Sequence, residues 1–136
     1  MNPLKLLSLF LACALTAQAQ LAVTVSPVKI TGQRVIVPLA LTNHLPQSVE
    51  SARAMCAVLD AQGKMVGQSA KWVIGGAPNR PALSPQAGTT YNFVITSPRP
   101  LETTNLTTRI VLNRVILEHG QITNANAVVS MTAAAK

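Results

Sequence analysis

Residues 51–74 read SARAMCAVLDAQGKMVGQSAKWVI, and this stretch decides the fold. Residues 51–60 and 64–74 are apolar-rich runs of strand length, and the turn segment DAQGK at 60–64 joins the end of one to the start of the other. Gly63 can take the left-handed conformation that a compact hairpin requires. The stretch therefore predicts two long antiparallel strands joined by a tight turn.

The same pattern continues outward from this hairpin. In residues 33–42 every second side chain is aliphatic, which is typical of a half-buried strand, but Pro38 lacks a ladder donor and predicts a free edge or a bulge there. Residues 75–87 are rich in glycine and proline and predict an irregular crossover. Further strands are expected at residues 21–25, 89–97, 107–117 and 122–131.

Seven short strands in one stretch of chain predict an all-β fold. We expect a single antiparallel sandwich of the immunoglobulin or fibronectin type III kind over residues 20–131, followed by a frayed tail at residues 132–136. An open barrel is the alternative. The Cys…Trp…Cys pattern of true immunoglobulin domains does not occur.

The first nineteen residues have the layout of a signal peptide. Lys5 precedes a short apolar block, and Ala17 and Ala19 stand at the −3 and −1 positions of a cleavage site before Gln20. The mature protein is therefore expected to be secreted or periplasmic. Lipoprotein anchoring through Cys13 is a minority interpretation. The apolar block is too short for a membrane anchor, and we expect no transmembrane helix in the mature chain.

The composition is apolar and basic. Apolar residues make up 49% of the chain, which excludes a disordered protein. The full chain carries a net charge of +7, so an anionic component of the envelope or an acidic protein is an expected partner. The basic residues are scattered singly, however, and aromatic platforms are scarce, so nucleic acid is not an expected partner. Lys71 and Trp72 form the one basic–aromatic pair and a candidate contact for a carbohydrate or a protein.

A resemblance to the bacterial FxLYD-type domains appears at this point, over about fifty residues. Those domains are small extracytoplasmic sandwiches, so the resemblance implies a sandwich fold and no reaction. This chain departs from their pattern at Cys56 and Leu59, where that family has Phe and Tyr. The matching features are an Asn after the second strand, an apolar strand ending in Asp, a turn ending in Gly and a Leu-x-Pro before an aromatic strand: Asn43, Asp60, Gly63, Leu83, Pro85, Tyr91 and Phe93.

No residue pattern points to catalysis. Asp60 and Glu118 flank tight turns, where carboxylates commonly cap backbone donors, and His44 and His119 are the two candidate bases. Neither a nucleophile elbow nor a Ser/His/Asp signature accompanies them. We therefore predict that the protein is not an enzyme, and we name no catalytic residue and no cofactor.

A small extracytoplasmic copper or zinc carrier is the alternative function. It would use His44 or His119 with a methionine, although the sequence has neither a His-x-His nor a Cys-x-x-Cys pair and defines no metal ligand. Met55 and Cys56 are adjacent on a strand and should point to opposite faces. Cys56, the one cysteine after residue 19, is expected to be a buried apolar residue or to pair with another chain.

Two arginines lie within the strand predicted at residues 107–117. Arg109 and Arg114 are five residues apart, so strict alternation puts them on opposite faces. One of them should then start on an apolar face and reach solvent or an acid such as Asp60 or Glu118. The leading hypothesis is a small non-catalytic binding or structural module of the cell envelope, whose exposed strand edges could pair with a partner.

Overall fold

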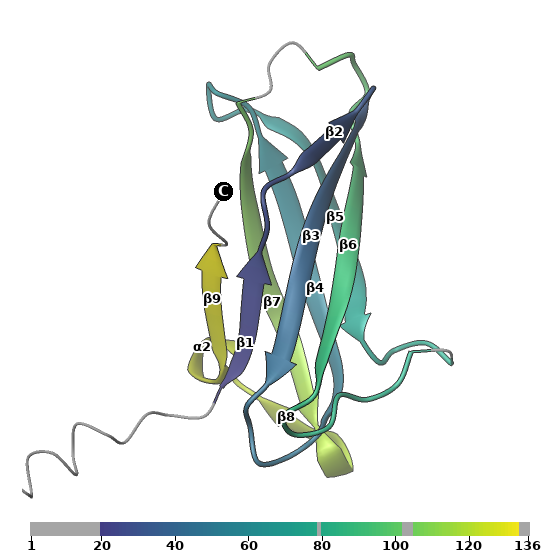
Figure 1. Ribbon diagram of the computed structural model, residues 1–136, viewed down its shortest axis with the longest axis vertical. Helices are drawn as coiled ribbons and strands as arrows, with labels where there is room; N and C mark the ends of the chain where they lie inside the picture. Colours follow the sequence, from purple (N-terminus) through teal and green to yellow (C-terminus); the bar gives the residue numbers. More distant parts are fainter. Residues whose placement is uncertain (1–19, 79, 102–104, 134–136) are drawn as a thin grey trace, which may run out of the picture.

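The computed structural model describes residues 20–78, 80–101 and 105–133. In this part the chain is all-β, with nine strands in two sheets that enclose an aliphatic core (Figure 1). The expected signal peptide at residues 1–19, with Cys13, lies outside the described residues.

The first sheet is built around one central strand. β3 (Arg34–Asn43) pairs antiparallel with β6 (Gly88–Thr96) on one side. On its other side it pairs first with β2 (Lys29–Thr31) and then with β1 (Leu21–Val25). β9 (Val129–Ala133) completes the sheet by pairing in parallel with β1.

The second sheet is antiparallel, in the order β5-β4-β7-β8. Its strands are β4 (Val49–Leu59), β5 (Met65–Ile74), β7 (Thr107–Leu117) and β8 (Gln121–Thr123). The 3-10 turn η1 (Glu118–Gly120) links β7 to β8. The single-turn helix α2 (Ala125–Val128) then carries the chain from β8 in the second sheet to β9 in the first (Figure 1).

The predicted hairpin is present, and its turn is held by Asp60. The Asp60 Oδ1 atom accepts hydrogen bonds from the backbone N–H groups of Gln62 and Lys64, both at 2.9 Å. Gly63 has a φ of +81°, as expected for a compact turn. The alternation in β3 is confirmed too, because its four alternating aliphatic side chains are buried: Val35, Val37, Leu39 and Leu41.

The structure corrects the expected number and course of the strands. β2 was not expected, and the single strand predicted at residues 122–131 is divided into β8, α2 and β9. The division occurs at a turn in which the Ala127 N–H donates to the Asn124 carbonyl oxygen. β9 then runs on to Ala133, and it makes the one parallel pairing among the described strands.

Pro38 lies in a central strand and not at a free edge. The Ser26 N–H donates to the Pro38 carbonyl oxygen at 3.0 Å, so this side of Pro38 faces the interruption between β1 and β2. The N–H that proline lacks would point to the same side, where residues 26–28 form no ladder. The gap is therefore in the neighbouring strand, and no pairing of β3 with β6 is lost.

Candidate functional site

In the part of the chain that the structure describes, the outer edge of β7 has no strand partner over half its length. β8 pairs only with residues 115–117 of β7, because the chain then crosses to the first sheet. Among the described strands, none pairs with residues 107–112 of β7 on that side. These six residues therefore present unpaired backbone groups, which can accept an added strand.

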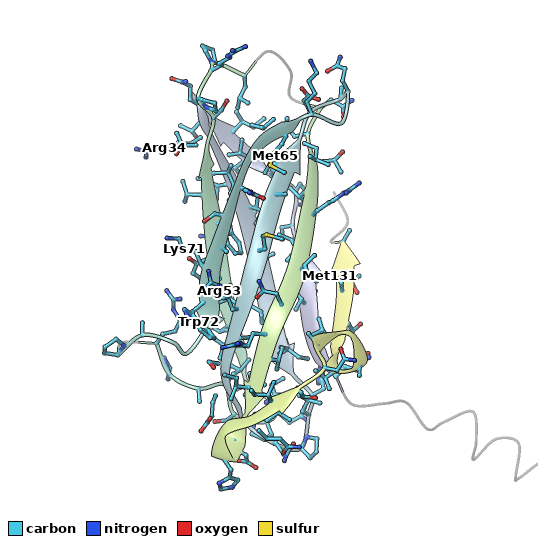
Figure 2. All side chains as sticks on the ribbon, turned by 180° about the vertical axis from the view of Figure 1, so that it is seen from behind. Arg34, Arg53, Met65, Lys71, Trp72 and Met131 are labelled. Atoms are coloured by element: carbon cyan, nitrogen blue, oxygen red, sulfur yellow. The ribbon has the colours of Figure 1, made fainter. Side chains whose placement is uncertain are left out.

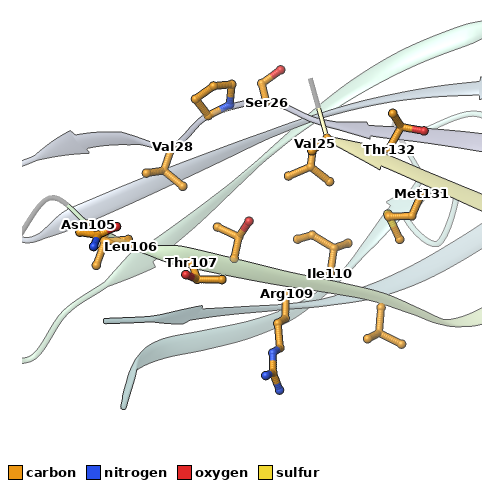
Figure 3. Close-up of a pocket in the computed structure, with 14 residues that line it drawn as sticks. Val25, Ser26, Val28, Asn105, Leu106, Thr107, Arg109, Ile110, Met131 and Thr132 are labelled. Carbon is orange, nitrogen blue, oxygen red and sulfur yellow. The ribbon is translucent and has the colours of Figure 1, made fainter. Parts of the chain in front are cut away.

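A cleft of about 800 Å³ runs beside this edge, between the two sheets. We call it the β7 cleft; its other walls are the interruption at residues 25–28 and the end of β9. In Figure 3, Ile110 points into the cleft toward Val25, whereas Arg109 leaves the opposite face of β7. The apolar part of the lining comes from three segments: Val25, Pro27, Val28, Leu106, Ile110, Val111, Met131 and Ala133.

The opposite side of the molecule is closed. A Cβ atom added to Gly67 of β5 would lie 2.6 Å from the Ile95 side chain of β6, so the two sheets are in close contact there. On the β7 side, β9 pairs with β1 and does not extend the second sheet. The β7 cleft therefore lies on the side of the molecule away from the close contact between β5 and β6.

The candidate acid and base residues do not line the β7 cleft. Asp60 serves the hairpin turn, and Glu118 lies in η1. His44 is exposed at the end of β3, and His119 is exposed in η1 with a φ of +66°. No described acid or histidine lines the cleft, whose wall is apolar and hydroxyl-bearing apart from the Arg109 backbone segment and Asn105.

The candidate metal ligands are not brought together either. Cys56 is fully buried as a free thiol, and this burial raises its pKa to about 11. Met65 and Met131 are exposed on different sheets. In the described ranges no three His, Cys, Asp or Glu side chains cluster, so no observation favours the metal-carrier alternative.

Arg109 and Arg114 lie on the same face, contrary to the expectation from strict alternation. Asn113 is an extra residue with no partner in β4: Ala54 pairs with Leu112, and Arg53 pairs with Arg114. Such a β-bulge shifts the alternation by one residue. Both arginines therefore point to the outer face of the second sheet, and neither has to leave the core.

Trp72 lies on that outer face as well, and not in the core where a lone strand tryptophan usually packs. It is half-buried, pairs with Arg53 across the strands, and covers Gly76, where any Cβ atom would overlap the indole. Its carbonyl oxygen accepts a hydrogen bond from the Arg80 guanidinium. Figure 2 shows Arg53 and Trp72 near each other on this face.

Two groups of residues were missed by sequence reasoning. The walls of the β7 cleft come from three segments that become neighbours only on folding, although the Ser26–Pro27 break and Pro38 hint at an interrupted sheet. Arg53 was not singled out, because the two bulges beside it, at Asn113 in β7 and Val73 in β5, leave no signature in the sequence.

Comparison with known proteins yields structural neighbours alone. The sequence matches no protein-family profile and no curated protein sequence. IrmA from Escherichia coli is similar in structure, with a TM-score of 0.51 and 11% identity over 84% of this chain and 92% of that chain. The putative ApaA protein from Bordetella pertussis has a TM-score of 0.53 and 17% identity over 79% and 89%. At these identities the likeness supports the fold and nothing further.

Proposed function

We propose that this protein is a small non-catalytic binding or structural module of the cell envelope, secreted or periplasmic, with an immunoglobulin-like or fibronectin type III-like sandwich. The signal-peptide pattern at residues 1–19 supports the location. The β3-centred sheet facing the β5-β4-β7-β8 sheet supports the sandwich. Among the described residues, no helix is long and apolar enough to span a membrane.

The observation that carries the proposal is the open edge of β7 beside an apolar cleft. An extended segment of a partner protein can add to this edge as a strand, with its backbone hydrogen-bonded to residues 107–112. Six residues of strand span about 20 Å. Every second side chain of the added strand would enter the β7 cleft, where Ile110 and Val28 provide apolar contacts.

The proposal predicts which amide groups respond to a bound peptide. A binder selected from a displayed library of random eight-residue peptides is added to the 15N-labelled mature chain. We expect the largest shifts, and slower amide exchange, at residues 107–112. Shifts confined to another surface, or the absence of any selectable peptide, would contradict the proposal.

A matched pair of substitutions separates the cleft from the outer face. Thr108 is half-buried and lines the β7 cleft, whereas Thr90 of β6 is exposed and is not among the residues that line the cleft. We expect Thr108→Lys to weaken peptide binding at least ten-fold, because a charge then stands where apolar side chains insert. Thr90→Lys should leave binding within about two-fold, with circular dichroism melting curves confirming that both variants fold.

A further inference from the structure

Three arginines lie on the outer face of the second sheet. Strict alternation along β7 would have placed two of them, Arg109 and Arg114, on opposite faces. Arg53 of β4 stands directly opposite Arg114 of β7, and Arg109 lies on the same side beside Ala57, about 13 Å further along. We call this surface the arginine face; it is defined by Trp72, Arg53, Arg114, Met55, Val111 and Arg109.

The arginine face has no compensating carboxylates. The acids that the structure describes lie at its two ends: Asp60 in the hairpin turn, Glu50 bonded to the Gly120 N–H, and Glu118 in η1. Within the described part of the chain, none of them pairs with Arg53, Arg109 or Arg114. Like charges directly opposite on neighbouring strands, as in Arg53 and Arg114, destabilise a sheet unless an anion lies between them.

Apolar side chains stand between the arginines. Met55 is 38% exposed and Val111 is 49% exposed, and they are paired across β4 and β7 in the row between Arg53 and Arg109. Met65 is 55% exposed at the hairpin end of the same sheet. Trp72 adds a half-buried indole beside Arg53 (Figure 2).

We infer that the arginine face binds the surface of a bilayer that contains anionic phospholipids. Guanidinium groups bind lipid phosphates in a bidentate manner, and methionine, valine and tryptophan side chains enter the headgroup boundary. An acidic protein would satisfy the charges but not the protruding apolar row, which a bilayer accommodates without matching its shape. This inference concerns the outer face of the second sheet, which shares Arg109 and Val111 with the lining of the β7 cleft.

Trp72 makes the inference directly measurable, because it is the one tryptophan in the chain. The mature chain is mixed with vesicles of phosphatidylcholine alone or with 30% phosphatidylglycerol. We expect co-sedimentation and a blue shift of Trp72 emission with the anionic vesicles only, weakened by salt. Inorganic phosphate in millimolar excess should not release the protein, since a free anion lacks the apolar contact.

Two triple variants with the same net charge provide the control. Each arginine near an anionic surface is worth about five-fold in partitioning, so R53Q/R109Q/R114Q should lower vesicle binding about 100-fold. The matched variant K29Q/R34Q/R99Q removes three exposed charges elsewhere and should lower binding less than ten-fold. M55S/V111T should keep the salt-sensitive binding but lose the part that survives high salt.

Several outcomes would overturn the inference. Equal losses in the two triple variants would show attraction by net charge alone. Vesicle binding without a change in Trp72 emission would place the contact on another surface. Binding to poly-glutamate but not to anionic vesicles would assign the arginine face to an acidic protein.

Discussion

Asn43 ties the end of β3 to the crossover between the sheets. It is fully buried, and its Nδ2 group donates to the carbonyl oxygens of Gln47 at 2.9 Å and Leu83 at 3.0 Å. Its Oδ1 atom accepts from the Leu45 N–H at 2.9 Å. Two of the residues that carry the FxLYD resemblance, Asn43 and Leu83, thus touch each other in a structural contact.

Replacing Asn43 should be costly. Asn43→Ala leaves the Gln47 carbonyl oxygen and the buried Leu45 N–H without these partners. It also removes one of the two donors to the Leu83 carbonyl oxygen, which keeps the Val49 N–H. We expect the substitution to lower the free energy of unfolding by about 3 kcal/mol. Asn92→Ala, at an exposed position in β6, is the matched control and should change it by less than about 0.5 kcal/mol. Urea denaturation followed by circular dichroism measures both, and equal effects would refute the structural role of Asn43.

Because its thiol is buried, Cys56 should make the free energy of unfolding depend on pH in the alkaline range. Its pKa is raised from 9.0 to about 11 because the thiolate is disfavoured in the core. The folded state holds the thiol proton more tightly than the unfolded state does. The contribution of Cys56 to the free energy of unfolding is therefore complete below pH 9 and is lost as the pH rises toward 11.

The corresponding measurement compares wild type with Cys56→Ala between pH 8 and pH 11. We expect the free energy of unfolding to fall more steeply with pH in the wild type, since both proteins share all other titrating groups. The thiol should also react with Ellman's reagent at pH 8 only after unfolding. Parallel pH profiles for the two proteins would contradict the assignment.

At the scale of elements, β5 ends because two glycines turn the chain sharply. Gly75 and Gly76 have φ values of +58° and +76°, and both lie against their surroundings. A Cβ atom at Gly75 would overlap the Glu50 carbonyl oxygen of β4, and one at Gly76 would overlap Trp72. The turn into the crossover therefore depends on close backbone contact as well as on left-handed geometry.

A comparison of two glycines separates these effects. Gly32 has a similar φ of +61°, but nothing lies within 4 Å of its added Cβ. Gly32→Ala should cost about 1 kcal/mol of unfolding free energy for the left-handed backbone alone. Gly75→Ala should cost at least about 3 kcal/mol, because backbone must also move. Thermal denaturation of both variants tests this, and similar melting temperatures would contradict it.

At the scale of the whole molecule, the course of β9 shapes both candidate surfaces. By pairing with β1, β9 covers the edge of the first sheet and leaves residues 107–112 of β7 unpaired. Val128 and Val129 pack against the core along the way. The same crossing therefore stabilises one sheet and opens the β7 cleft beside the other.

Removing residues 124–136 should expose the edge of β1 that β9 covers, in addition to the unpaired edge of β7. We expect the free energy of unfolding to fall by about 3 kcal/mol, from the lost apolar burial, and self-association to increase because β1 becomes a free edge. The control, Met131→Ser in the full chain, alters one exposed side chain and keeps the β1–β9 ladder. Urea denaturation and analytical ultracentrifugation measure the two effects, and a truncated chain of unchanged stability would contradict this role for β9.

Local patterns predicted most of the strands because they depend on neighbours in sequence. The strands at residues 21–25 and 107–117 were placed at their observed bounds, and the hairpin turn at residues 60–64 forms as expected. The bulge at Asn113 was not predictable, since the residue itself has no special backbone requirement. Its effect on Arg109 and Arg114 arises from pairing with β4, which alternation alone does not encode.

By itself the sequence determined the alternating aliphatic faces, the tight turns and the excess of positive charge, since each of these is a property of residues close together in the chain. Tertiary structure alone decided that β9 joins the first sheet, that a cleft lies beside β7, and that three arginines share one face. Those features depend on which strands pair with each other in the folded protein. Paired strands can lie more than eighty residues apart in the sequence, as β1 and β9 do, so patterns among neighbouring residues do not determine the pairing.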